Sequence, residues 1–113
     1  TPEVEAEIKA LGTPVSEFVV GLFGFFRKAY QANQGFDNPP VHDPCTIAYL
    51  IDPDIVQTRK APVHVELAGA LTTGMTVTDL REPADASCHT QVATTLDHAG
   101  FWRLVTDALK TLA

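Results

Sequence analysis

The segment from Thr13 to Gly35 constrains the fold more than any other part of this sequence. Thr13 followed by Pro14 is typical of a helix start, and Gly35 is typical of a helix end. Apolar side chains recur at helical spacing along the segment and also occupy its other sides. The helical stripe consists of Val15, Phe18, Val19, Leu22, Phe26 and Ala29, and Val20, Phe23, Phe25 and Tyr30 add apolar surface elsewhere. A helix that is apolar nearly all round is buried on more than one side, so we expect this helix to belong to a larger body than 113 residues supply.

Composition narrows the class of protein. The chain is 45% apolar and 19% charged, which is typical of a globular domain. Its net charge of -6 argues against nonspecific nucleic-acid binding, which needs a basic surface. The most apolar run, from Phe18 to Phe26, is far shorter than the roughly 20 residues of a membrane span. With two cysteines and no recognisable targeting signal, we expect a reduced, cytoplasmic protein.

The remaining pattern predicts further helices and several short strands. We expect helices over residues 1–12, 43–51 and 97–112, and strands within 61–67, 74–80 and 90–97. Gly21 and Gly24 would let another element approach the long helix closely. Helices followed by short strands and a final helix indicate an α+β protein or a piece of an α/β fold.

The candidate chemistry lies in the stretch "PPVHDPCTIAYLIDP". Asp43 before Pro44 is a helix N-cap pattern, and taken alone a structural cap is the favoured interpretation. A carboxylate has several lone-pair sites, so Asp43 could cap the helix and still coordinate an ion. His42 directly precedes it, and a single loop histidine is more often an ordinary surface residue than a catalyst.

A zinc site on His42, Cys45, Cys88 and His89 is a weaker interpretation. If Cys88 and His89 lie in extended chain, their side chains point to opposite faces. Structural zinc pairs usually have intervening residues between the two ligands. Cys45, on the first turn of an apolar helix, fits a small buried side chain better.

The segments "GFDNPPVHDPCTIAYLIDPDI" and "GALTTGMTVTDLR" resemble the inosine–uridine-preferring nucleoside hydrolases. The resemblance runs from "TPVSEF" to "GFWRLVTDAL" and is to the C-terminal third of that family. The histidine–aspartate–proline element is most similar to that of the pyrimidine-preferring ribonucleoside hydrolases. The resemblance implies an α/β fold related to doubly wound nucleotide-binding domains. It also implies cleavage of the N-glycosidic bond of ribonucleosides to ribose and free base, with a bound calcium ion.

The resemblance also implies roles for particular residues. Asp43 matches a calcium ligand, and His42 matches a histidine that faces the nucleobase and is implicated in protonating the leaving group. Tyr30 and Gln34 match two positions, one helical turn apart, that face the base. Relatives carry the Gln and the Tyr in the opposite order as well. The implied partner is a ribonucleoside, and we expect a homo-oligomer that binds neither nucleic acid nor membrane.

The family's N-terminal aspartate cluster, of the form DxDxxxDD, does not occur in this sequence. Calcium takes six to eight oxygen ligands, so Asp43 alone would not hold it tightly. We therefore expect residues 1–113 to be a C-terminal segment of a nucleoside hydrolase domain that lacks the N-terminal part and is inactive alone. The alternative is a non-catalytic binding or assembly module that retains the shape of the hydrolase C-terminal part.

Overall fold

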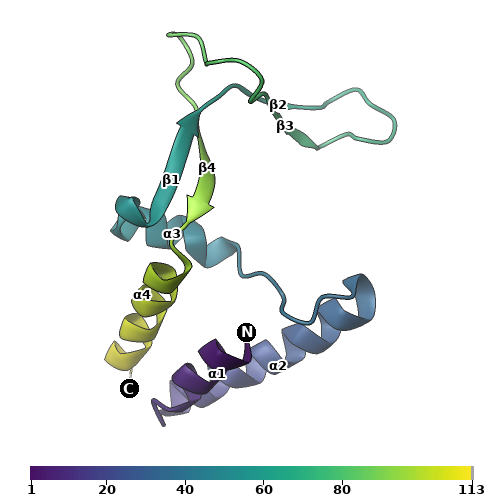
Figure 1. Ribbon diagram of the computed structural model, residues 1–113. Coiled ribbons are helices and arrows are strands. Elements are labelled where there is room, and N and C mark those ends of the chain that lie inside the picture. Colours follow the sequence, from purple (N-terminus) through teal and green to yellow (C-terminus); the bar gives the residue numbers. More distant parts are fainter. Residues whose placement is uncertain (113) are drawn as a thin grey trace. The chain divides into compact units, whose positions relative to one another are not determined.

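The computed structural model describes residues 1–112, which form helices and short strands (Figure 1). The helices are α1 (Pro2–Lys9), α2 (Pro14–Gln34), α3 (Asp43–Ile51), the 3-10 turn η1 (Pro53–Ile55) and α4 (His98–Thr111). The strands are β1 (Val56–Lys60), β2 (Val63–Val65), β3 (Thr76–Thr78) and β4 (Gln91–Leu96). The chain divides into a helical unit, residues 1–55 with 97–112, and a strand unit, residues 56–96. The predicted mixture of helices and short strands is confirmed.

Local signals set the ends of α2 as the sequence predicts. The Thr13 hydroxyl accepts a hydrogen bond from the Ser16 backbone N–H at 3.1 Å, and the Ser16 hydroxyl accepts one from the Thr13 N–H at 3.0 Å. This reciprocal pair satisfies two backbone donors that a helix start leaves free. At the other end, Gly35 adopts a φ of 72°, a left-handed conformation that glycine adopts without steric cost.

The core of the helical unit lies between α1, α2 and α4. Its buried centre consists of Val4, Ile8 and Leu109, and partly buried side chains pack around it: Leu11, Val15, Val19, Val20, Phe23, Trp102 and Val105. The Trp102 ring meets Phe23 edge to face, with centroids 6.1 Å apart. An ion pair of 2.6 Å between Glu5 and Arg27 links α1 to α2. The helices are thus joined by apolar packing with one partly buried charge pair.

The structure corrects the expected buried stripe of α2. Val20 and Phe23, which the spacing placed outside the helical stripe, pack against this core. Phe18 and Phe25, by contrast, are 66% and 68% exposed. The buried face of α2 is the face that packs against α1 and α4. Helical spacing in the sequence does not show which face of an all-round apolar helix that will be. Gly21 and Gly24 have no neighbour within 4 Å of an added Cβ, so within residues 1–112 no other element approaches the helix closely at these positions.

The start of α4 depends on a tightly enclosed glycine. The Asp97 carboxylate caps the helix, at its predicted start, by accepting a hydrogen bond from the Gly100 N–H at 3.0 Å. Gly100 is buried, and a Cβ there would lie 2.5 Å from Asp97 Oδ2 and 3.3 Å from the Ile55 side chain. A side chain at this position would therefore displace the cap.

Gly100→Ala should destabilise the chain, whereas Gly21→Ala should stabilise it. The first substitution disturbs a cap worth about 1 kcal/mol, and the second gains up to about 1 kcal/mol of helix propensity in open space. Urea unfolding followed by circular dichroism measures both. Stabilisation by both substitutions would show that the Asp97 cap does not need the space at Gly100.

The strand unit consists of two antiparallel pairs. Strand β1 pairs with β4, with an irregularity between Gln57 and Thr58, and β2 pairs with β3. Strands β2, β3 and β4 were predicted, but β1 was not, because its sequence VQTRK lacks an apolar alternation. The expected half-buried face of β2 is wrong within the described residues, since Val65 and Leu67 are 54% and 80% exposed.

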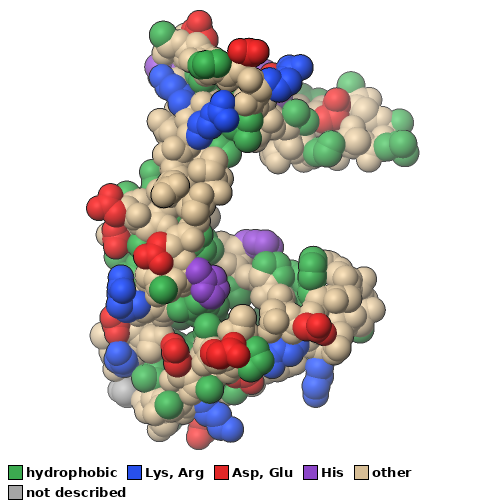
Figure 2. Space-filling model, in the orientation of Figure 1, with side chains coloured by type: hydrophobic (Ala, Val, Ile, Leu, Met, Phe, Trp, Pro, Cys, Tyr) green, Lys and Arg blue, Asp and Glu red, His purple; other side chains and the backbone are tan. Residues whose placement is uncertain are grey.

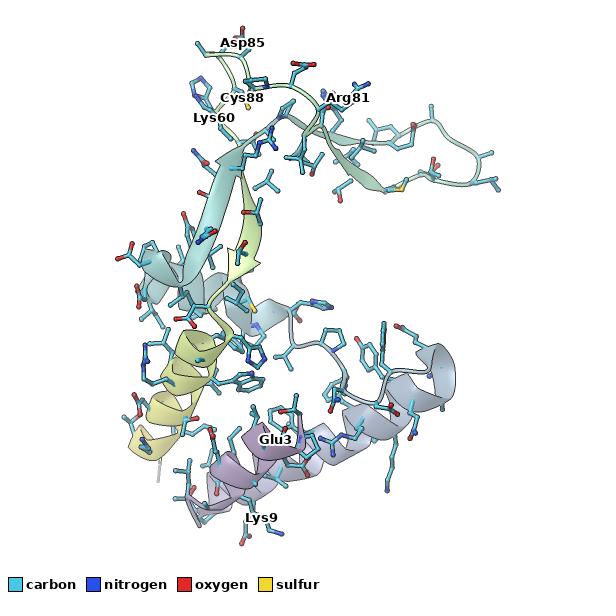
Figure 3. All side chains as sticks on the ribbon, viewed as in Figure 1. Glu3, Lys9, Lys60, Arg81, Asp85 and Cys88 are labelled. Atoms are coloured by element: carbon cyan, nitrogen blue, oxygen red, sulfur yellow. The ribbon has the colours of Figure 1, made fainter. Side chains whose placement is uncertain are left out.

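Polar contacts hold the loops of the strand unit. Arg81 donates hydrogen bonds to the Asp79 carboxylate at 2.7 and 2.9 Å, which holds the pKa of Asp79 well below its usual range. Lys60 lies beside the loop that follows Arg81 and donates to the Ala86 carbonyl at 3.5 Å (Figure 3). The strand unit therefore depends on these loop contacts, with Ala61 as its buried apolar residue within residues 56–96.

Across residues 1–112, no helix combines the length and apolar character needed to cross a bilayer. On the face drawn in Figure 2, both acidic and basic side chains are visible.

Candidate functional site

A cavity of about 340 Å³ lies between α2 and the start of α3, inside the helical unit. Its lining residues are Leu22, Phe23, Phe26, Tyr30, Pro40, Val41, His42, Asp43 and Pro44. Three of the four residues singled out by the sequence, Tyr30, His42 and Asp43, therefore share one cavity. Gln34 is exposed on the last turn of α2 and does not line it.

One wall of the cavity is a row of side chains on α2. Leu22, Phe26 and Tyr30 follow one another at four-residue spacing, so they lie on one face of the helix in successive turns. These side chains lie beside the core-packing residues of α2, since Phe23 both packs in the core and lines the cavity, and Phe26 is 48% exposed. The wall is apolar except for the Tyr30 hydroxyl.

The opposite wall is the chain that returns from α2 to α3. Gly35 ends α2, and the Phe36 ring then lies 6.4 Å from the Tyr30 ring, which keeps the loop against the helix. Pro39 and Pro40 restrict the backbone that follows. Sequence patterns did not predict Pro40 and Val41 as lining residues. The four-residue repeat on α2 was the available signal for Leu22 and Phe26.

Asp43 is not the cap of α3, which corrects the favoured interpretation from sequence. The N-cap is His42, with φ -89° and ψ -50°, and it makes no side-chain cap hydrogen bond. Because the helical conformation begins at His42, Asp43 falls inside the first turn. Its backbone carbonyl accepts a hydrogen bond from the Thr46 hydroxyl at 2.8 Å. Among residues 1–112, no donor occupies the Asp43 carboxylate, which lies near the positive end of the helix.

The lining of the cavity provides one carboxylate, and calcium takes six to eight oxygen ligands. No three His, Cys, Asp or Glu side chains within the described residues come together as a metal site. These residues alone therefore do not fit calcium, although Asp43 could provide one ligand. His42, Cys45, Cys88 and His89 therefore form no zinc cluster within the described residues. The Cys45 thiol instead donates a hydrogen bond to the Val41 carbonyl at 3.3 Å.

The turn after α3 and an aromatic pair on α4 are structural features of the helical unit. Asp52 ends α3, and its carboxylate accepts a hydrogen bond from the Asp54 N–H at 3.2 Å. Phe101 is 2% exposed and packs against Trp102, as expected of core residues. None of these residues lines the cavity.

A family model and several individual proteins that are similar in sequence to this chain all carry nucleoside hydrolase descriptions. A sequence model described as inosine-uridine preferring nucleoside hydrolase matches residues 1–103. Proteins of that name from Crithidia fasciculata and Leishmania major are 44% and 45% identical to the chain over 112 residues. The pyrimidine-specific ribonucleoside hydrolase RihA of Shigella boydii is 40% identical over 106 residues.

A solved structure agrees with these sequences. The purine-preferring ribonucleoside hydrolase from Gardnerella vaginalis superimposes with a TM-score of 0.77 at 25% identity and covers 98% of this chain. The match takes up 36% of that structure, and 36%, 35% and 34% of the Crithidia, Leishmania and Shigella relatives. The chain thus spans about a third of the length of the relatives it matches. Over that span, it belongs to the inosine-uridine preferring nucleoside hydrolase family.

Proposed function

We propose that this chain forms the base-facing part of a ribonucleoside hydrolase that cleaves the N-glycosidic bond to give ribose and free base. The observation that carries the proposal is the single cavity lined by Tyr30, His42 and Asp43 in a member of this family. Such an enzyme needs a flat apolar surface for a nucleobase, a proton donor for it and an anionic group towards the sugar. The cavity offers one of each.

The α2 wall suits the nucleobase. Leu22 and Phe26 give apolar surface, and the Tyr30 hydroxyl can donate or accept a hydrogen bond at the edge of a base. Gln34 lies one turn beyond Tyr30 on α2, outside the cavity, and would contact the base only from the rim. The preference for one nucleobase over another would accordingly depend more on Leu22, Phe26 and Tyr30 than on Gln34.

His42 is the proton donor in this proposal. Cleavage moves the electron pair of the N-glycosidic bond onto the base, where a proton from the protonated His42 side chain neutralises it and leaves the imidazole neutral. The sugar passes through an oxocarbenium-like state and takes up the oxygen of water. A positioned general acid contributes about 10²–10⁴-fold to such a step. No second carboxylate lines the cavity to accept the proton of the attacking water, so the chain provides the acid side of the reaction.

Asp43 is proposed as one ligand of a calcium site whose other oxygens lie outside this chain. Its carboxylate is exposed and accepts no hydrogen bond within residues 1–112. The isolated chain would then bind calcium weakly and lack activity. We also propose that the complete enzyme is a cytoplasmic homo-oligomer.

The second candidate function is a non-catalytic binding or assembly module with the shape of this part of the hydrolase. The observation in its favour is that the chain spans 36% of a relative and brings one carboxylate to the cavity. The reading frame upstream of Thr1 distinguishes the two candidates. An aspartate cluster in that frame supports the enzyme, and a nearby start codon supports the module.

Ribose release is the direct test of the proposed activity. The part of the Crithidia fasciculata relative outside the match would be fused to residues 1–113, giving a protein here termed the joined chain. We expect the joined chain to release ribose from uridine or inosine and to lose this activity with a chelator. The chain of 113 residues should release none, because it lacks the other oxygen ligands. Chelator-sensitive turnover by the shorter protein, or an inactive but folded joined chain, would contradict the proposal.

A further inference from the structure

We infer that the apolar groove between α3 and α4 is the docking site for the part of the hydrolase fold that this chain does not span. The inference rests on family membership and goes beyond the proposed activity, because it concerns assembly of the fold. Both walls of the groove belong to the helical unit. This surface is called the α3–α4 groove below.

The α3–α4 groove has a volume of about 420 Å³ and is lined almost entirely by apolar side chains. Its residues are Asp43, Pro44, Ile47, Ala48 and Ile51 on α3, with Leu104, Val105 and Ala108 on α4. Ile47 and Ile51 are 57% and 67% exposed, and Leu50 on the same helix is 75% exposed. A contiguous apolar surface of this kind marks an interaction site in a soluble protein.

Helix α3 is composed mostly of apolar residues, yet most of its side chains are exposed. Its nine residues, DPCTIAYLI, include one charged side chain, Asp43, and only Ala48 among them is buried. Contacts with α4 and η1 cover one side of the helix. A short helix of this composition is typically stabilised by packing on several sides, so a further apolar layer is required.

The length of the relatives supports this occupant. The chain covers 36% of the Gardnerella structure and superimposes on it with a TM-score of 0.77 over 98% of its own length. The backbone of this segment is therefore similar to that of a chain almost three times as long. The rest of that longer chain is the polypeptide available to cover α3. The groove's chemistry agrees, since an occupant needs apolar side chains along α3 and α4 and meets a charge only at Asp43.

Docking in the groove would also reach the candidate site. Asp43 and Pro44 line both the α3–α4 groove and the cavity that holds Tyr30 and His42. A segment that fills the groove would therefore end beside the Asp43 carboxylate. Assembly of the fold and completion of the site would then be a single event.

Thiol labelling tests the inference without relying on activity. In a background with Cys45→Ser and Cys88→Ser, Ala108→Cys places a probe in the groove, and Ile51→Cys gives a second probe on the facing wall. Ala86→Cys, at an exposed position in the polar loop of residues 81–87, is the matched control. Each variant would be reacted with a small maleimide as the 113-residue chain and as the joined chain.

We expect both groove probes to react readily in the 113-residue chain and about tenfold or more slowly in the joined chain, where labelling needs local opening. The control should react at similar rates in both. Protection without ribose release would support docking while contradicting the proposed activity. Equal labelling of the groove probes in both proteins would overturn the inference. So would protection in the shorter chain that increases with its concentration, because the occupant would then be a second copy.

Discussion

Asp43→Asn in the joined chain is expected to lower calcium affinity and turnover together, each by roughly 100-fold or more. Asn replaces an anionic oxygen with a neutral one, and the strength of a calcium site depends on the charge of its ligands. The fold should persist. Asp43 is the first residue of α3 and caps nothing, so the change costs only the attraction to the helix dipole, about 0.3–1 kcal/mol. Calcium titration and ribose release measure the two effects.

Asp52→Asn is the matched control for that substitution. It makes the same chemical change at the other end of the same helix, where Asp52 accepts a hydrogen bond from the Asp54 N–H. Asp52 does not line the cavity, so calcium affinity and turnover should stay at the parent values. Equal losses in the two variants would indicate that damage to α3, and not loss of a ligand, explains the Asp43 result.

His42→Ala is expected to leave calcium bound and to lower kcat for uridine or inosine by about 10²–10⁴-fold. The loss should depend on the leaving group, because His42 is proposed to give the departing base its proton. A nitrophenyl riboside releases a stable anion that needs no proton, so its hydrolysis should change little. Parallel assays of the two substrates measure the difference.

Equal losses with both substrates would remove the acid role from His42. The side chain would then position the substrate or support the loop that leads into α3. Leu71→Ala is a suitable control substitution, because Leu71 is 99% exposed in the strand unit. It should alter neither substrate's kinetics.

The features predictable from sequence were those that depend on neighbours along the chain. Thr13 and Gly35 bound α2, and Asp97 caps α4, because each signal acts within a few residues. The cap at Asp43 was predicted wrongly because the helical conformation starts one residue earlier, at His42. A shift of one residue is enough to turn a cap into a residue of the first turn.

The features that could not be predicted depend on distant partners. Strand β1 is polar, and only its pairing with β4 makes it a strand. Which face of α2 packs was decided by α1 and α4, so Phe23 is in the core while Phe25 is exposed. The cavity forms because Leu22, Phe26 and Tyr30 of α2 meet the chain returning at residues 40–44, a contact set by loop geometry. Family resemblance, and not periodicity, linked Tyr30 with His42 and Asp43 beforehand.

The central claim is that two adjacent residues at the mouth of α3 serve one nucleoside site in different ways. Calcium titration of the joined chain carrying either Asp43→Asn or His42→Ala tests it most directly. We predict that the His42→Ala protein binds calcium as tightly as its parent, while the Asp43→Asn protein loses roughly 100-fold or more in affinity. Unchanged calcium affinity in the Asp43→Asn protein would contradict the claim and leave Asp43 as a residue of the first helical turn alone.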